Sequence, residues 1–171
     1  DMQLHAWHPA ALACSEAGAK AYVEAGLRAR AMGDEAVIDI DQFSLEGRAM
    51  RPVKRAVAVI HDGWRGTVQR LAAKTVFAMR LAYGSDPKDL LAYVGPSISR
   101  AHYEVSESTA MAFRRLGTAY GNCAGEKDGV WSVDLWQANR LLLEEAGLRP
   151  DHIEVTTSCA FAEEGKFFSY R

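Results

Sequence analysis

The 171-residue sequence has little net charge and no long apolar run. Its formal net charge is -2, which gives no general attraction for nucleic acid or for an anionic lipid surface. A membrane-spanning helix needs about 20 consecutive apolar residues, and no stretch approaches that length. The content of 49% hydrophobic and 25% charged residues is typical of a globular protein. We therefore expect neither a nucleic-acid nor a membrane partner.

Cysteines are few, and the common nucleotide-binding motifs are missing. Cys14, Cys123 and Cys159 are too widely spaced for a disulfide framework or a paired-cysteine metal clip. The first residues lack the basic and apolar regions of a secretory signal. Neither GxGxxG nor GxxxxGK[ST] occurs, which excludes the classical dinucleotide and P-loop sites. We expect a cytoplasmic protein with a single domain over residues 1–171.

Apolar spacing predicts alternating helices and strands. Helices are expected over 15–32, 67–83, 106–116 and 134–146, and strands over 36–40, 56–60, 90–94, 153–157 and 167–170. Residues 41–54 are expected to form a loop or weak edge strand, and 117–130 a glycine-rich loop. The alternation indicates some parallel pairing. It favours an α/β or α+β sandwich, with a mixed sheet and flanking helices.

Residues 56–67 are the stretch most typical of a functional site. His61 ends an apolar strand, and two glycines then surround Trp64 and Arg65 before the helix predicted from Thr67. Such a bend presents an imidazole and a guanidinium at the end of a strand. The free N–H groups of a helix N-terminus beside them favour an anion. The alternative is a tight strand-to-helix turn in which Trp64 only packs.

Other side chains outside this bend have the chemistry of a site. Cys159 follows a predicted strand, and a thiol with an imidazole from another segment could form a nucleophile–base pair. A free cysteine is more often a small buried apolar group. His5 could serve as a neutral ligand if the start of the chain folds over the bend. His152 is expected at the surface, and the sequence assigns no role to His102.

Five segments within 56–171 resemble the laccase-domain family, also called multicopper polyphenol oxidoreductase or purine nucleoside phosphorylase of the polyphenol-oxidase type. The sequence HDGWRGT resembles the family's HAGWRG, VGPSIS its GPxI, YEV its YEV, DLWQAN its DLxxAN and FFSYR its FFSYRR. They occupy residues 61–67, 94–99, 103–105, 134–139 and 167–171. Residues 1–55 match poorly, so we expect a laccase-domain-like chain that lacks part of the front of a family member.

The resemblance implies a fold and an activity. The fold would be an α/β sandwich of the class grouped with cytotoxic-factor-like cysteine hydrolases. The activity would be phosphorolysis of purine nucleosides, with deamination of adenosine, so the partners would be a purine nucleoside and phosphate. His61 and Arg65 would be catalytic, and a guanidinium suits phosphate because it engages two oxygens at once. Substrate or phosphate contacts would come from Trp64, Arg65, Gly66, Gly95 and Ser97.

The resemblance also implies a zinc site held by His, Cys and His, with a fourth position open to water. These ligands would be His5, Ser44 and His61, because counting back from His61 to the family's cysteine reaches Ser44. A serine hydroxyl is a weaker zinc ligand than a thiolate, so we expect low occupancy. Asp41, or Asp62 in place of the family's alanine, could supply an oxygen ligand.

Three functions remain open. The first is a metal-dependent purine nucleoside enzyme. The second is a decayed, non-catalytic nucleoside-binding or structural member of the family, which the missing cysteine favours. The third is a copper-dependent polyphenol oxidase, which would need a cysteine with two histidines. The sequence indicates neither the preferred purine nor the oligomeric state.

Overall fold

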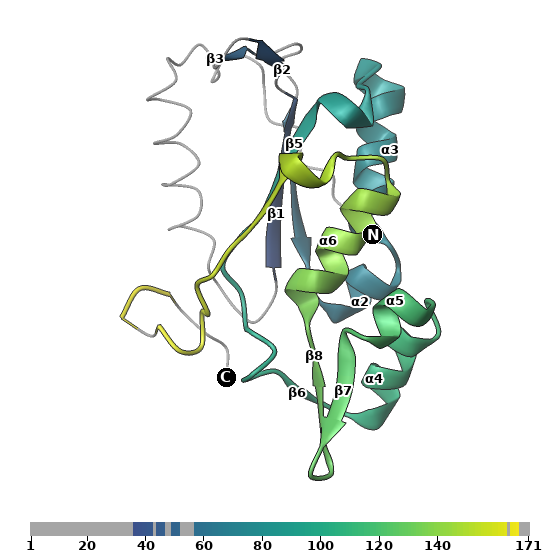
Figure 1. Cartoon of the computed structure of the whole chain (residues 1–171), viewed down its shortest axis with the longest axis vertical. Helices are drawn as coiled ribbons and strands as arrows, with labels where there is room; N and C mark the ends of the chain where they lie inside the picture. Colours follow the sequence, from purple (N-terminus) through teal and green to yellow (C-terminus); the bar gives the residue numbers. More distant parts are fainter. Residues whose placement is uncertain (1–35, 43, 47–48, 52–56, 164, 168–171) are drawn as a thin grey trace.

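A computed structural model describes residues 36–42, 44–46, 49–51, 57–163 and 165–167, with side chains from residue 58 onward. Figure 1 shows the arrangement of the elements. The label η denotes a 3₁₀ helix. In chain order they are β1 (Ala36–Gln42), β2 (Ser44–Glu46), β3 (Ala49–Arg51), β4 (Val57–Asp62), α2 (Trp64–Val68), α3 (Leu71–Tyr83), η2 (Pro87–Asp89), β5 (Leu90–Val94), β6 (Glu104–Val105), α4 (Glu107–Arg114), α5 (Thr118–Gly121), β7 (Ala124–Lys127), β8 (Val130–Val133), α6 (Leu135–Glu145), η3 (Pro150–His152) and β9 (Ile153–Val155).

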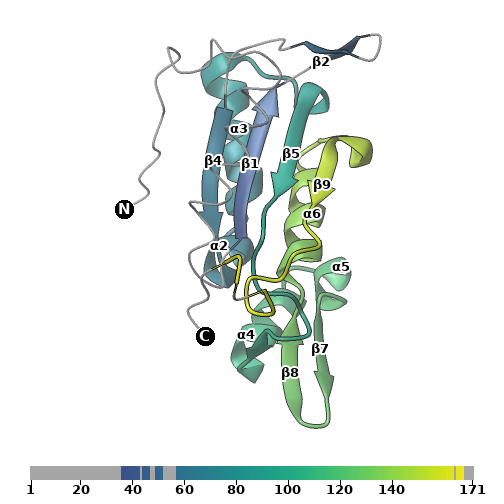
Figure 2. The same ribbon diagram turned by 90° about the vertical axis from the view of Figure 1, so that its left-hand side faces the viewer.

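The largest sheet has the strand order β4-β1-β5-β9. Strand β1 is antiparallel to both β4 and β5, whereas β5 and β9 are parallel. Helix α3 packs on β4, and α6 packs on β5, β9 and α3. Figure 2 shows both helices on the same face of this sheet. The predicted mixed sheet with flanking helices and some parallel pairing is therefore confirmed.

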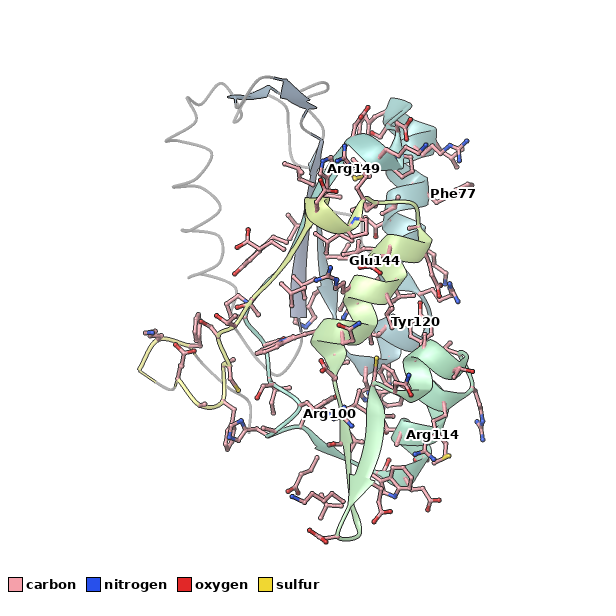
Figure 3. All side chains as sticks on the ribbon, in the orientation of Figure 1. Phe77, Arg100, Arg114, Tyr120, Glu144 and Arg149 are labelled. Atoms are coloured by element: carbon pink, nitrogen blue, oxygen red, sulfur yellow. The ribbon has the colours of Figure 1, made fainter. Side chains whose placement is uncertain are left out.

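A second, smaller sheet has the order β6-β8-β7 and packs against α4. The β7–β8 hairpin turns at Asp128 and Gly129, whose φ angles of 54° and 81° are left-handed, as a two-residue hairpin loop of this kind requires. Arg114 of α4 lies 4.8 Å from the ring centroid of Trp131 on β8 (Figure 3). The prediction of a loop over 117–130 was therefore wrong, because this segment forms α5 and β7.

The predicted helix starts at Ser106 and Asp134 are confirmed by their capping hydrogen bonds. Ser106 Oγ accepts from Thr109 N at 3.3 Å, and Asp134 Oδ1 accepts from Gln137 N at 2.9 Å. Each cap satisfies a backbone donor that has no partner inside its helix, which is typically worth about 1 kcal/mol. Strand β5 has the predicted bounds, and its alternate residues are buried.

The helix predicted over 67–83 forms two helices instead of one. Helix α2 begins at Trp64, and Arg70 separates it from α3 with a left-handed φ of 62°. A left-handed residue interrupts the backbone hydrogen-bond ladder of a right-handed helix, at a cost of about 1–2 kcal/mol. Arg70 forms an ion pair with Glu145 of α6, which holds the arginine at this break.

Three other expectations have different outcomes. The segment expected to be a loop or weak edge strand contains the β2–β3 hairpin. His152 was expected at the surface but is buried, with its Nδ1 3.2 Å from the carbonyl oxygen of Leu90. The helix predicted over 15–32 and most of the strand predicted over 167–170 lie outside the described residues.

Candidate active site

The bend after β4 has a buried inner face and an exposed outer face. Adjacent residues of a strand point to opposite faces, so the exposed His61 and the buried Asp62 diverge. Asp62 and Thr67 are 0% exposed, whereas Arg65 is exposed. The sequence thus places an imidazole and a guanidinium on the outside of a bend that is fixed from within.

Thr67 and Asn139 fix the inner face of the bend. Thr67 Oγ1 donates to the carbonyl oxygen of Gly63 at 3.0 Å, and Thr67 N donates to the same oxygen at 2.9 Å. The Asn139 amide of α6 donates to Thr67 Oγ1 at 3.3 Å and to the carbonyl oxygen of Leu135 at 3.1 Å. Helix α6 therefore anchors the first turn of α2.

Gly66 is required by the close approach of Asp62. A Cβ added to Gly66 would lie 2.1 Å from Asp62 Oδ1, far inside van der Waals contact. The buried carboxylate therefore occupies the space that a side chain at position 66 would take. This contact gives Gly66 a structural role, and it gives the Asp62 carboxylate a place on the inner side of the bend, away from His61.

Arg65 stacks on the indole beside it. The guanidinium carbon lies 4.5 Å from the ring centroid of Trp64, within the range of a cation–π contact. Trp64 is half-buried and packs against the core, whereas Arg65 is exposed. The indole thus supports the guanidinium at the surface of the bend.

The strand order brings the ends of three strands to one edge of the sheet. Because β4 and β5 are both antiparallel to β1, they run parallel to each other, and β9 runs parallel to β5. The carboxyl ends of all three strands therefore lie at the same end of the sheet. Strand β1 lies between β4 and β5, so these two strands are roughly 10 Å apart. In parallel arrangements of this kind, ligands bind outside the carboxyl ends of the strands. The His61 bend and the loop after β5 both lie at this edge.

The predicted contacts Gly95 and Ser97 belong to the loop after β5, and both are buried. Ser97 Oγ accepts a hydrogen bond from Trp136 Nε1 of α6 at 2.6 Å. The Ser97 carbonyl oxygen accepts from Ala160 N at 3.0 Å. Ser97 therefore joins α6 to the segment after β9, and its burial favours this structural role.

The structure does not bring Ser44 to His61. His61 pairs with Val37 near the start of β1, and Ser44 follows seven residues further along, beyond the end of that strand. Seven extended residues span roughly 20 Å. Figures 1 and 2 show β2, which begins at Ser44, beyond the end of the large sheet that is opposite α2. This register places Ser44 and His61 far apart along the described strands, and His5 lies outside the described residues.

The described residues alone do not form the zinc site that the resemblance implies. Among them, no three His, Cys, Asp or Glu side chains gather where they could hold a metal ion. Of the expected ligands, only His61 and Asp62 have side chains in the described part of the chain, and Asp62 is buried on the inner side of the bend. A zinc ion at His61 would therefore need ligands from outside the described residues.

The structure pairs Cys159 with a histidine to which the sequence assigned no role. Cys159 Sγ lies 3.5 Å from Nδ1 of His102, and Ser99 N donates to the same sulfur at 3.3 Å. Burial raises the pKa of the thiol, but hydrogen bonds from Ser99, Ala162 and His102 outweigh burial and lower it to about 7. The segments that hold Cys159 and His102 follow β9 and β5, and only the sheet order places them together.

Comparison with known proteins identifies the family of this chain. Residues 49–171 match the family model described as multi-copper polyphenol oxidoreductase laccase. Residues 1–76 match a second model, described as the C-terminal part of phosphatidylglycerol lysyltransferase. Among the described residues, no helix has the length and apolar character needed to cross a bilayer.

Two curated relatives and one solved structure illustrate the similarity. The purine nucleoside phosphorylase of Bacteroides thetaiotaomicron is 36% identical over 118 residues, which cover 68% of this chain and 44% of the relative. Purine nucleoside phosphorylase YlmD of Bacillus subtilis is 36% identical over 121 residues, which cover 70% and 44%. The crystal structure of the hypothetical protein YfiH of Bacillus licheniformis aligns with a TM-score of 0.71 and 30% identity, covering 82% of this chain and 50% of that one.

The chain spans about half the length of the relatives it matches. The family match begins at residue 49, so Ser44 and His5 both precede it. The HDGWRGT bend, the loop after β5 and the DLWQAN start of α6 all lie within the matched residues. The chain belongs to the multi-copper polyphenol oxidoreductase laccase family.

Proposed function

We propose that this chain forms the part of a purine nucleoside phosphorylase site that binds phosphate, with Arg65 and His61 as the functional residues. The observation that carries the proposal is the two-faced bend after β4. Asp62 and Thr67 fix the bend from within, and His61 and Arg65 remain exposed at the carboxyl edge of the sheet. The names of the relatives support phosphorolysis as the reaction.

In phosphorolysis, a phosphate oxygen forms a bond to the anomeric carbon of the ribose as the bond to the purine nitrogen breaks. Arg65 would hold two phosphate oxygens and keep the attacking oxygen in place, because its planar guanidinium presents paired N–H donors. Its contact with Trp64 limits the positions that the guanidinium can take. His61 would exchange a proton with phosphate or with the departing purine, as an imidazole can near neutral pH.

The finer properties implied by the family are part of the same proposal. Adenosine deamination would need a metal-bound water, and the described residues offer only His61 and the buried Asp62 as expected ligands. The remaining ligands, and the walls of the purine site, would come from outside the described residues. The mixed sheet with helices on one face is compatible with the cysteine-hydrolase class of fold.

The proposal is tested by incubating the purified chain with inosine and inorganic phosphate and measuring hypoxanthine and ribose 1-phosphate. Adenosine, with and without phosphate, separates phosphorolysis from deamination, and metal content is measured by mass spectrometry on the same sample. Phosphate-dependent release of hypoxanthine that is lost in Arg65→Gln is the expected result. Release of hypoxanthine without phosphate would contradict the proposal.

A decayed, non-catalytic member of the family is the second candidate. It is favoured by the absence of three gathered metal-binding side chains among the described residues. Such a protein would bind inosine or phosphate, measured by titration calorimetry, without turnover. The copper oxidase reading has less support, because it needs a cysteine and two histidines together.

A further inference from the structure

We propose that Cys159 is a reactive thiolate, with His102 as its proton-exchanging partner, and that peroxides and other small electrophiles modify it. The proposal is independent of phosphorolysis, because it uses neither His61 nor Arg65. It rests on two groups that contact the Cys159 sulfur atom. Ser99 N donates to Cys159 Sγ at 3.3 Å, and Nδ1 of His102 lies 3.5 Å from it.

The backbone holds this pair in place from two sides. Ser97 and Cys159 form a parallel β-bridge, and Ala160 N donates to the Ser97 carbonyl oxygen at 3.0 Å. The backbone N–H of His102 donates to the Ser99 carbonyl oxygen at 3.0 Å, which closes the turn after β5 that carries both residues. The sulfur and the imidazole therefore belong to two segments that are fixed to each other.

The His102 ring makes polar contacts through Nδ1 and packs against the Phe161 ring. Its Nδ1 lies 3.2 Å from Ser99 Oγ as well as near the sulfur, and its centroid lies 5.1 Å from that of the Phe161 ring. A proton on Nδ1 can therefore be shared between the serine oxygen and the sulfur. A thiolate accepts hydrogen bonds more strongly than a thiol, so this arrangement stabilises the charged form.

Among the described residues of the segment after Cys159, the charged side chains of Glu163 and Lys166 pair with each other. Glu163 N donates to the Cys159 carbonyl oxygen at 3.0 Å, and the Glu163 carboxylate forms an ion pair with Lys166 at 2.8 Å. Hydrogen bonding therefore dominates, and it lowers the pKa of the thiol to about 7 although burial opposes this. At neutral pH, Cys159 would therefore be a thiolate in close to half of the molecules.

Cys123 is a natural control within the same chain. It is 1% exposed, and burial together with the negative charge of Asp134 raises its pKa to about 11. Cys159 is 8% exposed beside an exposed imidazole. The two thiols differ in both exposure and hydrogen bonding, so Cys123 serves as the control for a fully buried thiol, and the effect of the imidazole is measured by substituting His102.

The reaction with hydrogen peroxide can be written so that atoms and electrons balance. The thiolate sulfur attacks one peroxide oxygen, a sulfur–oxygen bond forms, and the oxygen–oxygen bond breaks. The sulfur loses two electrons to become a sulfenic acid, and the departing hydroxide takes the proton of the His102 imidazolium to become water. The peroxide is the only oxidant that this step requires.

The first test is alkylation of the folded chain with iodoacetamide from about pH 5 to about pH 10, with each cysteine followed by peptide mass spectrometry. We expect half-maximal labelling of Cys159 near pH 7, and labelling of Cys123 only after unfolding. His102→Gln should move the Cys159 midpoint upward and slow labelling at neutral pH by about threefold, because lower thiolate content is partly offset by higher nucleophilicity. Cys123→Ser should leave the Cys159 midpoint unchanged.

The second test is peroxide treatment followed by a sulfenic-acid trap such as dimedone. We expect a trapped adduct on Cys159 and none on Cys123, with less adduct in His102→Gln. Circular dichroism of each variant establishes that it is folded before labelling is compared. A Cys159 midpoint near about 8.5, the value of a free cysteine, would overturn the proposal. A midpoint that His102→Gln does not move would overturn the role of the imidazole.

Discussion

The Asn139 amide on α6 donates a hydrogen bond to Thr67 Oγ1 on α2, although the two residues are 72 positions apart. Both side chains are 0% exposed, so water does not replace this bond if it is lost. Thr67 Oγ1 in turn donates a hydrogen bond to the Gly63 carbonyl oxygen, which fixes the residue that precedes α2. The position of the His61 bend therefore depends on a side chain from a distant helix.

Replacing Asn139 with Ala should lower the free energy of unfolding by about 1–3 kcal/mol, because buried hydrogen bonds to Thr67 and Leu135 are lost. Urea unfolding followed by circular dichroism measures the change. Gln137→Ala on the same helix is the control, since Gln137 is exposed and its bond to Asp134 uses only its backbone N–H. Equal losses from the two substitutions would show that Asn139 is not an anchor.

Gly66→Ala should destabilise the fold by about 1–3 kcal/mol, because the new Cβ would overlap the buried Asp62 carboxylate. Gly121→Ala is the matched control, since the nearest atom to its Cβ would lie 3.8 Å away, in ordinary contact. In that case the higher helix propensity of alanine should leave stability unchanged or slightly raised. The melting temperatures of both variants measure the effect. An unchanged melting temperature in Gly66→Ala would mean that the Asp62 carboxylate has room to move.

Arg65→Lys should weaken binding of inorganic phosphate by about 1–3 kcal/mol, because lysine keeps the charge but loses the paired donors of the guanidinium. Titration calorimetry measures the affinity. Arg80→Lys, an exposed position on α3, controls for a general effect of charge. If Arg65→Lys lowers the melting temperature and leaves phosphate affinity unchanged, then Arg65 is structural.

Cys123 should make the fold less stable at alkaline pH. Its pKa rises from 9.0 to about 11 on folding, so its contribution to stability is fully present below pH 9.0 and is lost as pH rises through about 11. The loss should be about 2–3 kcal/mol, since two pKa units correspond to roughly 1.4 kcal/mol each. Urea unfolding at both ends of this range, compared with Cys123→Ala, isolates the contribution of this thiol. If the stability of the unchanged chain and of Cys123→Ala falls equally with rising pH, then Cys123 does not cause the loss.

Ser44→Cys should leave zinc affinity unchanged, because Ser44 follows β1 at the end of the strand opposite His61. Val37→His is the positive control, since Val37 is the register partner of His61 and paired positions lie about 5 Å apart on one face of the sheet. Zinc binding is measured with a competing chelator. A gain of affinity in Ser44→Cys alone would mean that the β1–β4 register does not describe the metal-binding state.

Local sequence determined the elements whose boundaries were predicted well. The bounds of β5 follow from its apolar run, and the starts of α4 and α6 follow from the capping side chains of Ser106 and Asp134. The break at Arg70 could not be predicted, because it depends on tertiary contacts. Its guanidinium pairs with Glu145 and lies 6.0 Å from the ring centroid of Tyr120.

The candidate site was predicted only in part, for the same reason. The HDGWRGT segment indicated His61 and Arg65, because strand, bend and helix are adjacent in sequence. The pairing of His102 with Cys159, 57 positions apart, depends on the parallel register of β5 and β9. The assignment of Ser44 as a metal ligand stays a prediction, because counting back from His61 crosses residue 49, where the family match begins.

Helix α6 supports two regions of the sheet edge through residues one turn apart. Asn139 holds the bend after β4, and Trp136 holds Ser97, which is bridged to Cys159. A rigid helix cannot move one of these supports without moving the other. Thermal fluctuations of the phosphate-binding bend and of the thiol segment should therefore be correlated, and hydrogen exchange in the two segments should slow together when either one is occupied.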